Sequence, residues 1–72
     1  MSERTYDRTW VEIENMLDRA EREQNMHYMK MQQRGMKKSE RIRHMANYKA
    51  LEGVIKTLKW TLGEKGIEHP LE

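Results

Sequence analysis

Residues 47–62, NYKALEGVIKTLKWTL, decide the fold, because no other stretch of the sequence is apolar on more than one face of a helix. With successive side chains about 100° apart, this helix carries two stripes. One stripe has the a/d spacing of a helix that packs along another helix: Tyr48, Leu51, Ile55, Leu58 and Leu62. The other, well round the cylinder, has only small residues: Ala46, Ala50, Gly53, Thr57 and Thr61. We therefore predict a helix with two packing faces.

Gly53 is the unusual member of the small stripe, since a glycine inside a helix costs roughly 1 kcal/mol relative to alanine. Either a close backbone neighbour requires the missing Cβ, or a solvated face tolerates it; we favour the close neighbour. The chain supplies only one partner helix, so the second face predicts a homodimer that forms a four-helix bundle. The alternative is a monomer whose C-terminal tail covers that face. The predicted dimer interface consists of Ala46, Ala50, Gly53, Thr57 and Trp60.

A first helix is expected over about residues 5–33, where core positions recur at alternating steps of four and three residues. These positions are Tyr6, Trp10, Ile13, Leu17, Ala20, Gln24, His27 and Met31. The helix start is left open between Thr5 and a capping box formed by Thr9 and Glu12. The other faces of this helix are charged, so it is expected to pack on one side only.

The second helix is expected over about residues 39–62, with Ser39 as its N-cap. Gly35 is the expected C′ residue of the first helix and Gly63 that of the second, because glycine takes a left-handed conformation without a Cβ penalty. The connection between the helices is short, which favours antiparallel neighbours.

The register of this hairpin can be tested within the sequence. Folding the chain about Gly35 and Met36 sets residues whose numbers sum to about 71 side by side. Apolar residues then face apolar residues and amides face amides: Ile13 meets Leu58, Leu17 meets Val54 and Ile55, Ala20 meets Leu51, Gln24 meets Asn47, and His27 lies beside His44. This agreement supports an all-α antiparallel two-helix hairpin.

The length of the chain limits how much core it can build. Its 72 residues make one domain, residues 1–72, of which residues 64–72 form a tail. A single core of this size rarely supplies more than about 3–5 kcal/mol, and without cysteine there is no disulfide, so a second chain would help. No apolar run approaches the roughly 20 residues that span a bilayer, so we expect a cytoplasmic protein without a membrane partner.

The two tryptophans, Trp10 and Trp60, are interpreted as large core anchors. Burial of both indoles would offset much of the ordering entropy of so short a chain. The tail residues Ile67 and Leu71 are expected to fold back over the open end of the hairpin, near both indole rings.

Charge is unevenly distributed along the chain, although the net charge is only +2. Residues 1–25 sum to −3, residues 26–45 to +5, and the rest to zero. The basic segment 26–45, here called the hairpin tip, carries Lys30, Arg34, Lys37, Lys38, Arg41 and Arg43. Phosphate groups bind to cations at this density, but a solvated turn explains the same residues.

Methionines also gather at the hairpin tip. The chain has seven, a high number for its length. Flexible thioethers line adaptable protein-binding surfaces, although filling a core is their commoner use. Met31 and Met45 are interpreted as core filler. Met26 and Met29 lie off the main stripe and are the predicted surface contacts.

Two Glu-x-x-x-His pairs, Glu23 with His27 and Glu40 with His44, come close together in the predicted register. They lack the Glu-x-x-His spacing of di-iron bundles and the strict geometry of zinc sites, so we expect no metal. Ion pairs on the helix surface explain the glutamates, and a polar layer with the neighbouring amides explains the histidines.

Motifs that carry catalysis are missing from the sequence. It has no cysteine, no serine in a glycine-flanked turn and no glycine loop that could cradle a phosphate. We therefore expect a protein that binds rather than an enzyme, with no cofactor and no small-molecule substrate.

Residues 49–60, KALEGVIKTLKW, followed by the His69-Pro70 tail, resemble small accessory proteins of tailed phages, particularly those of actinobacteria. The resemblance covers about the second half of the chain and carries no catalytic or binding residue across. It implies a phage protein made in the host cytoplasm that acts by binding a host or phage macromolecule.

Two functions are left open at this point. The first is an adaptor or inhibitor that grips a host or phage protein through the hairpin tip. The alternative is a dimeric four-helix bundle that binds RNA or DNA through the cations of the same tip.

Overall fold

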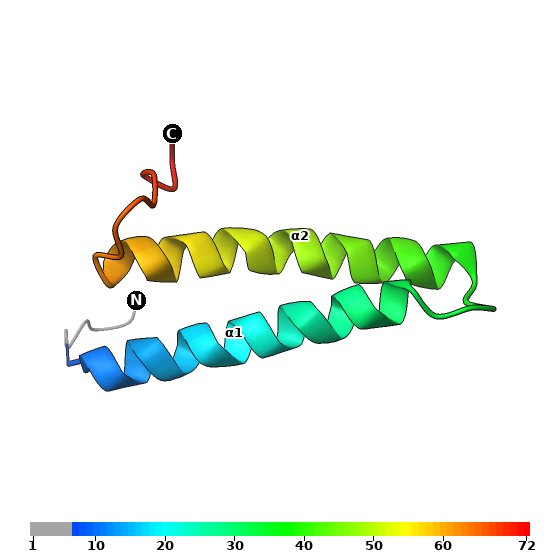
Figure 1. Cartoon of the computed structure of the whole chain (residues 1–72), viewed down its shortest axis with the longest axis horizontal. Coiled ribbons are helices and arrows are strands. Elements are labelled where there is room, and N and C mark those ends of the chain that lie inside the picture. Colours follow the sequence, from blue (N-terminus) through cyan, green and yellow to red (C-terminus); the bar gives the residue numbers. More distant parts are fainter. Residues whose placement is uncertain (1–6) are drawn as a thin grey trace, which may run out of the picture.

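The computed structural model describes residues 7–72, which form a hairpin of two helices (Figure 1). α1 spans Trp10–Met31 and α2 spans Lys38–Thr61. The helices run antiparallel, pack against each other and are joined by a loop at one end (Figure 1). Residues 7–72 contain no strand, which confirms the all-α prediction. Neither of these two helices is apolar over enough of its length to span a bilayer.

An N-cap threonine sets the start of α1. The Oγ1 of Thr9 accepts the backbone N–H of Glu12 at 3.1 Å, which satisfies one of the free amides of the first turn. Residues 7–9 are not helical, so the start predicted near residue 5 is wrong and the alternative cap at Thr9 is confirmed. The Glu12 carboxylate pairs with Arg8 instead of completing a capping box. The other candidate cap, Thr5, and the first stripe position, Tyr6, lie outside the described residues.

The loop between the helices departs from the predicted caps. α1 ends with Gln32 as its C-cap, so Gly35, with a φ of +79°, provides a left-handed turn two positions beyond C′. Lys37 is the N-cap of α2, and its carbonyl accepts the Arg41 N–H at 3.0 Å. Ser39 therefore lies inside the first turn of α2 and not at its N-cap position. The predicted C′ role of Gly35 and N-cap role of Ser39 are therefore wrong.

Gly63 ends α2 as predicted. Leu62 is the C-cap, and Gly63 at C′ has a φ of +74°. The backbone N–H groups of Gly63 and Glu64 donate to the carbonyls of Trp60 and Lys59, both at 3.0 Å, which is a Schellman motif. After this turn the tail leaves on the side of α2 opposite to α1 (Figure 1).

The seam between the helices follows the predicted register. The Nδ1 atoms of His27 and His44 lie 2.8 Å apart, and Gln24 Nε2 donates to the Tyr48 carbonyl at 3.5 Å. Residues of the seam are buried or half-buried: Ile13, Leu17, Ala20, Gln24, His27, Met31, His44, Tyr48, Leu51, Ile55, Leu58 and Leu62. Pairs whose numbers sum to about 71 therefore do meet, and the half-buried Met31 confirms its predicted role as core filler.

Little of this seam is fully enclosed. Among residues 7–72, Ala20 at 5% and Ile55 at 9% exposure are the only buried hydrophobic side chains. Large apolar side chains meet solvent as a result: Trp10, Val11, Met16, Met26, Tyr28, Met29, Ile42, Met45, Val54, Trp60 and Leu71. One hairpin thus leaves much apolar surface uncovered.

Four residues predicted for the interior lie at the surface, among them Trp60, which is 46% exposed. Trp10 is 63% exposed, because its register partner, Thr61, is the last residue of α2 at the open end of the hairpin. Met45 lies one position past the seam and is also exposed. Asn47 is exposed too, so Gln24 bonds to backbone instead of to a facing amide. The predicted core roles of Trp10, Trp60 and Met45 and the predicted amide pair are wrong.

The tail lies beside α2 instead of closing the open end of the hairpin. Its His69 ring packs edge to face on Trp60, with centroids 5.0 Å apart. The backbone N–H of Leu71 donates to His69 Nδ1 at 3.2 Å, while the Leu71 side chain is 89% exposed. The prediction that Leu71 covers the indoles is therefore wrong, and His69 is the residue that contacts Trp60.

Candidate functional site

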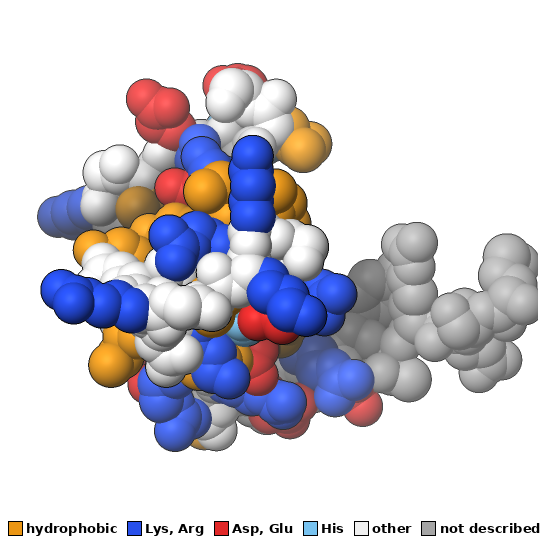
Figure 2. Space-filling model, turned by 90° about the vertical axis from the view of Figure 1, so that its right-hand side faces the viewer, with side chains coloured by type: hydrophobic (Ala, Val, Ile, Leu, Met, Phe, Trp, Pro, Cys, Tyr) orange, Lys and Arg blue, Asp and Glu red, His pale blue; other side chains and the backbone are white. Residues whose placement is uncertain are grey.

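The hairpin tip places all six predicted cations in solvent. Lys30 lies in the last turn of α1, Arg34 and Lys37 lie in the loop, and the others follow in the first two turns of α2: Lys38, Arg41 and Arg43. Figure 2 looks onto this end of the molecule and shows Lys and Arg side chains spread across it. The structure therefore gathers at one end the charges that the sequence places between residues 26 and 45.

Ion pairing separates these cations from the arginines around α1. Those arginines each pair with a carboxylate one turn away: Arg8 with Glu12 at 3.2 Å, Arg19 with Glu23 at 3.1 Å, and Arg22 with Asp18 at 3.0 Å. Within residues 7–72, none of the six tip cations forms an ion pair. Arg41 Nη2 donates to the backbone carbonyl of Gln33 at 3.2 Å, which holds the guanidinium over the loop. The tip charges are thus free to meet an anionic partner.

The two predicted surface methionines are exposed, Met26 at 40% and Met29 at 61%. Met29 Sδ accepts a weak hydrogen bond from Asn25 Nδ2 at 3.6 Å. Met26 lines a shallow hollow with the ion-paired residues Arg19, Arg22 and Glu23. The structure therefore places Met26 among the paired charges of α1 rather than among the free cations of the loop.

A layer of polar side chains lies in the seam between the two helices of the hairpin tip. The His27 and His44 rings are tilted by 45° with centroids 5.1 Å apart, and their 2.8 Å Nδ1 contact requires one Nδ1 to donate and the other to accept. Tyr28 and Tyr48 adjoin this layer with ring centroids 6.1 Å apart. The two imidazole rings are hydrogen-bond partners for each other. No group of three or more metal-ligating side chains occurs within the described part of the chain.

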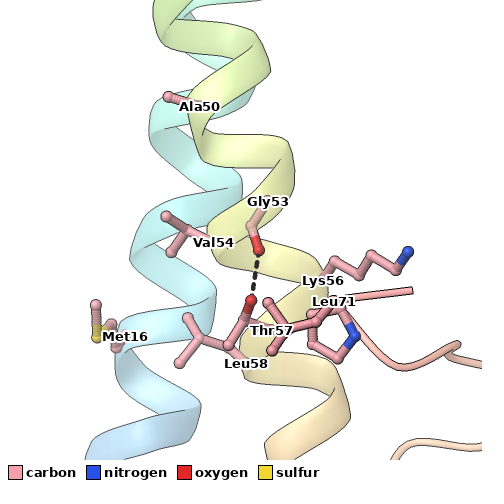
Figure 3. Close-up of a pocket in the computed structure, with 9 residues that line it drawn as sticks. Met16, Ala50, Gly53, Val54, Lys56, Thr57, Leu58 and Leu71 are labelled. Carbon is pink, nitrogen blue, oxygen red and sulfur yellow. Dashed lines mark hydrogen bonds between the residues drawn. The ribbon is translucent and has the colours of Figure 1, made fainter.

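A groove of about 500 Å³ follows α2 on the side where the tail lies (Figure 3). It is lined by one residue of α1, six of α2 and two of the tail: Met16, Ala50, Gly53, Val54, Lys56, Thr57, Leu58, Pro70 and Leu71. Apart from the Lys56 amino group, its side chains are apolar or small, so an apolar partner would fit it.

Three residues of the predicted dimer interface line this groove, and all five are exposed: Ala46, Ala50, Gly53, Thr57 and Trp60. We call these five residues the outer face of α2. A Cβ added to Gly53 would meet no atom within 4 Å, so the chain itself supplies no close neighbour there. The Thr57 hydroxyl donates to the Gly53 carbonyl at 2.9 Å (Figure 3). The Thr61 hydroxyl donates to the Thr57 carbonyl, also at 2.9 Å, so neither hydroxyl needs a further partner.

The tail covers only part of this outer face. Pro70 and Leu71 line the groove and His69 contacts Trp60, while Ala46 and Gly53 stay exposed. Sequence reasoning missed the contact of His69 because the tail has no periodicity that fixes a register. The only signal was that apolar residues continue beyond the end of α2.

Comparison with protein-family models, curated proteins and solved structures finds no match for this chain.

Proposed function

We propose that this chain is a non-enzymatic binding module, an adaptor or inhibitor that engages a host or phage protein through the hairpin tip. The observation that carries the proposal is the set of exposed tip cations that form no ion pair within residues 7–72, while Arg8, Arg19 and Arg22 are ion-paired. Arginine and methionine are enriched at protein interfaces, and exposed Met29 lies one residue before the tip cation Lys30. An acidic protein surface with an apolar centre would match this combination.

A nucleic acid is the second candidate partner, favoured by the charge of the tip itself. The tip carries six cations and a single carboxylate, Glu40. Each phosphate that such cations neutralise releases condensed counterions, so affinity would fall steeply with salt. For a protein partner, salt would act mainly on the association rate.

The first experiment is a pull-down from host lysate, with and without nuclease. The bait is compared with the tip variant Lys37→Glu, Lys38→Glu, Arg41→Glu and with a control of equal charge change away from the tip: Lys49→Glu, Lys59→Glu and Lys65→Glu. A partner that survives nuclease and is lost only with the tip variant supports protein binding. Loss on nuclease treatment supports the second candidate, and equal capture by the bait and both variants would refute the tip as the site.

The double change Met26→Ala and Met29→Ala separates the two partner classes further. A protein interface should lose at least tenfold in affinity, because buried thioethers contribute contact area. Binding to a nucleic acid should change by less than about twofold, since phosphate contacts dominate it. Binding to each partner is followed by anisotropy across a salt series.

We further propose that the chain works as a homodimer, two hairpins forming a four-helix bundle through the outer face of α2. The exposed surface of one hairpin and its two buried side chains support this proposal. A typical stable interface buries about 800 Å² per partner, and the exposed side chains of Ile42, Val54 and Trp60 can supply apolar area to it. Sedimentation equilibrium at micromolar concentration tests it, and a cooperatively folded monomer of 8.8 kDa would refute it.

The proposed source is a tailed phage, with action in the host cytoplasm. The resemblance of residues 49–60 to phage accessory proteins supports it. A partner captured from an actinobacterial lysate by the tip, and absent from an unrelated lysate, would strengthen this assignment.

A further inference from the structure

We propose that the groove along the outer face of α2 is the seat of a second copy of this chain, and that tail residues 67–71 are a cover that the second copy displaces. This inference rests on the proposed homodimer and adds the competition between the tail and the dimer.

The tail lies along one edge of the face where two helices would approach each other. Pro70 and Leu71 line the groove together with Gly53 and Thr57 (Figure 3). Gly53 is open, with no atom within 4 Å of an added Cβ, so a facing backbone could come near it. The proline ring and the chain end at the edge of the groove narrow that approach. The groove of about 500 Å³ is the space left beside Pro70 and Leu71, and a helix about 10 Å across would fit against α2 there only if the tail moved aside.

The contacts that hold the tail are few. His69 packs on Trp60, but no hydrogen bond or ion pair joins residues 65–72 to either helix within the described chain. The bonds of the tail are internal: Leu71 N–H to His69 Nδ1 at 3.2 Å and Glu72 N–H to the His69 carbonyl at 3.1 Å. The tail can therefore move away as a unit while keeping its own hydrogen bonds.

A second copy fits the uncovered face better than the tail does. The outer face continues past the tail to the exposed residues Ala46 and Ile42, in steps of four and three residues that a facing helix can follow. The tail reaches only the C-terminal half of that length. The hydroxyls of Thr57 and Thr61 are already bonded to the α2 backbone, so a dry helix contact would leave neither unsatisfied.

The test measures dimer dissociation by sedimentation equilibrium for the full chain and for His69→Ala. An edge-to-face ring contact changes an equilibrium constant by about threefold to tenfold, and each dimer releases two tails. His69→Ala should therefore tighten the dimer about tenfold to hundredfold. Glu68→Ala, an exposed change in the same tail, is the matched control and should leave dissociation within twofold.

A second pair of variants tests the face itself. Ala46→Glu places a charge on the outer face beyond the reach of the tail and should weaken the dimer at least tenfold. Asn15→Glu adds the same charge to an exposed position of α1 and should have little effect.

The position of the tail is read directly by NMR on the native chain. The His69 ring protons should carry ring-current shifts from Trp60 at low concentration and lose them as the dimer forms. A dimer that forms with these shifts intact, or that His69→Ala leaves unchanged, overturns the competition and leaves the homodimer standing. A chain that stays monomeric with either residue at position 69 overturns both.

Discussion

The inner and outer faces of α2 differ in what covers them. The inner face packs on α1 and contains Ile55, one of the two buried side chains of the described chain. The outer face has the same helical spacing but carries Ala46, Gly53 and Thr57, all exposed, with the tail along part of it. Spacing alone thus identifies a face that can pack, while side-chain size decides how closely a partner can approach and whether the chain can fold without that partner.

The largest effect is expected from the inner face. Ile55→Ala should destabilise the fold by about 2–4 kcal/mol, because it removes a buried side chain from a core with few others. Urea unfolding followed by circular dichroism measures this loss. Val54→Ala, one residue away and exposed, is the control and should cost less than about 1 kcal/mol. Equal losses would show that the two faces are not distinct.

Gly53 tests the outer face, and the effect should have opposite signs for folding and association. Gly53→Ala should stabilise the fold by up to about 1 kcal/mol through helix propensity, since its Cβ meets nothing within the chain. Gly53→Leu should weaken the dimer by about 1–3 kcal/mol by overpacking a close helix contact. Thermal melts at low and high protein concentration separate the two effects. If Gly53→Leu stabilises the fold at both protein concentrations, the hypothesis of a close helix contact at Gly53 is refuted and its face is solvated.

The hairpin tip belongs to neither face, and substitutions of its cations should hardly change the free energy of unfolding. The triple change Lys37→Glu, Lys38→Glu, Arg41→Glu removes no ion pair among residues 7–72, so the free energy of unfolding should stay within about 1 kcal/mol. Chemical denaturation of the tip variant measures this. A loss above 2 kcal/mol would show that the bond from Arg41 to the Gln33 carbonyl holds the loop together.

The smallest effect is expected at Thr61, which carries a hydroxyl bonded to its own helix. Thr61→Ala should stabilise the fold by a few tenths of a kcal/mol, because alanine has the better helix propensity and no buried group loses a partner. Leu58→Ala on the inner face, three residues earlier, should cost several times more. A differential melt of both variants side by side gives the contrast.

Sequence predicted the seam well because packing there is periodic. Steps of three and four residues in both helices fixed the register, and the His27 to His44 contact confirms it. Helix ends were harder to predict than the seam. Ser39 could have capped α2 with its side chain, but the N-cap of the helix is Lys37, which makes no side-chain cap bond. Trp10 fits the stripe but sits where the opposite helix stops, and a pattern within one helix carries no information about where its partner ends.

The candidate sites were predictable to different degrees. Exposure of the tip cations followed from their density, because so many like charges cannot be enclosed by a small core. Their lack of ion pairs could not be predicted, since it depends on which carboxylates lie one turn away in the folded hairpin. The tail contact on the outer face was least accessible, because nine residues without periodicity can rest in many places.

The Schellman turn at Gly63 has a practical consequence for anyone who handles this protein. Because the turn sends the chain out on the side of α2 away from α1, a fusion tag attached after Glu72 starts beside the groove. Such a tag would lengthen the segment that covers the groove. It would therefore disfavour the dimer and shift the measured molar mass toward that of the monomer. Labels meant for counting subunits are better attached at the exposed Asn25, which does not line the groove.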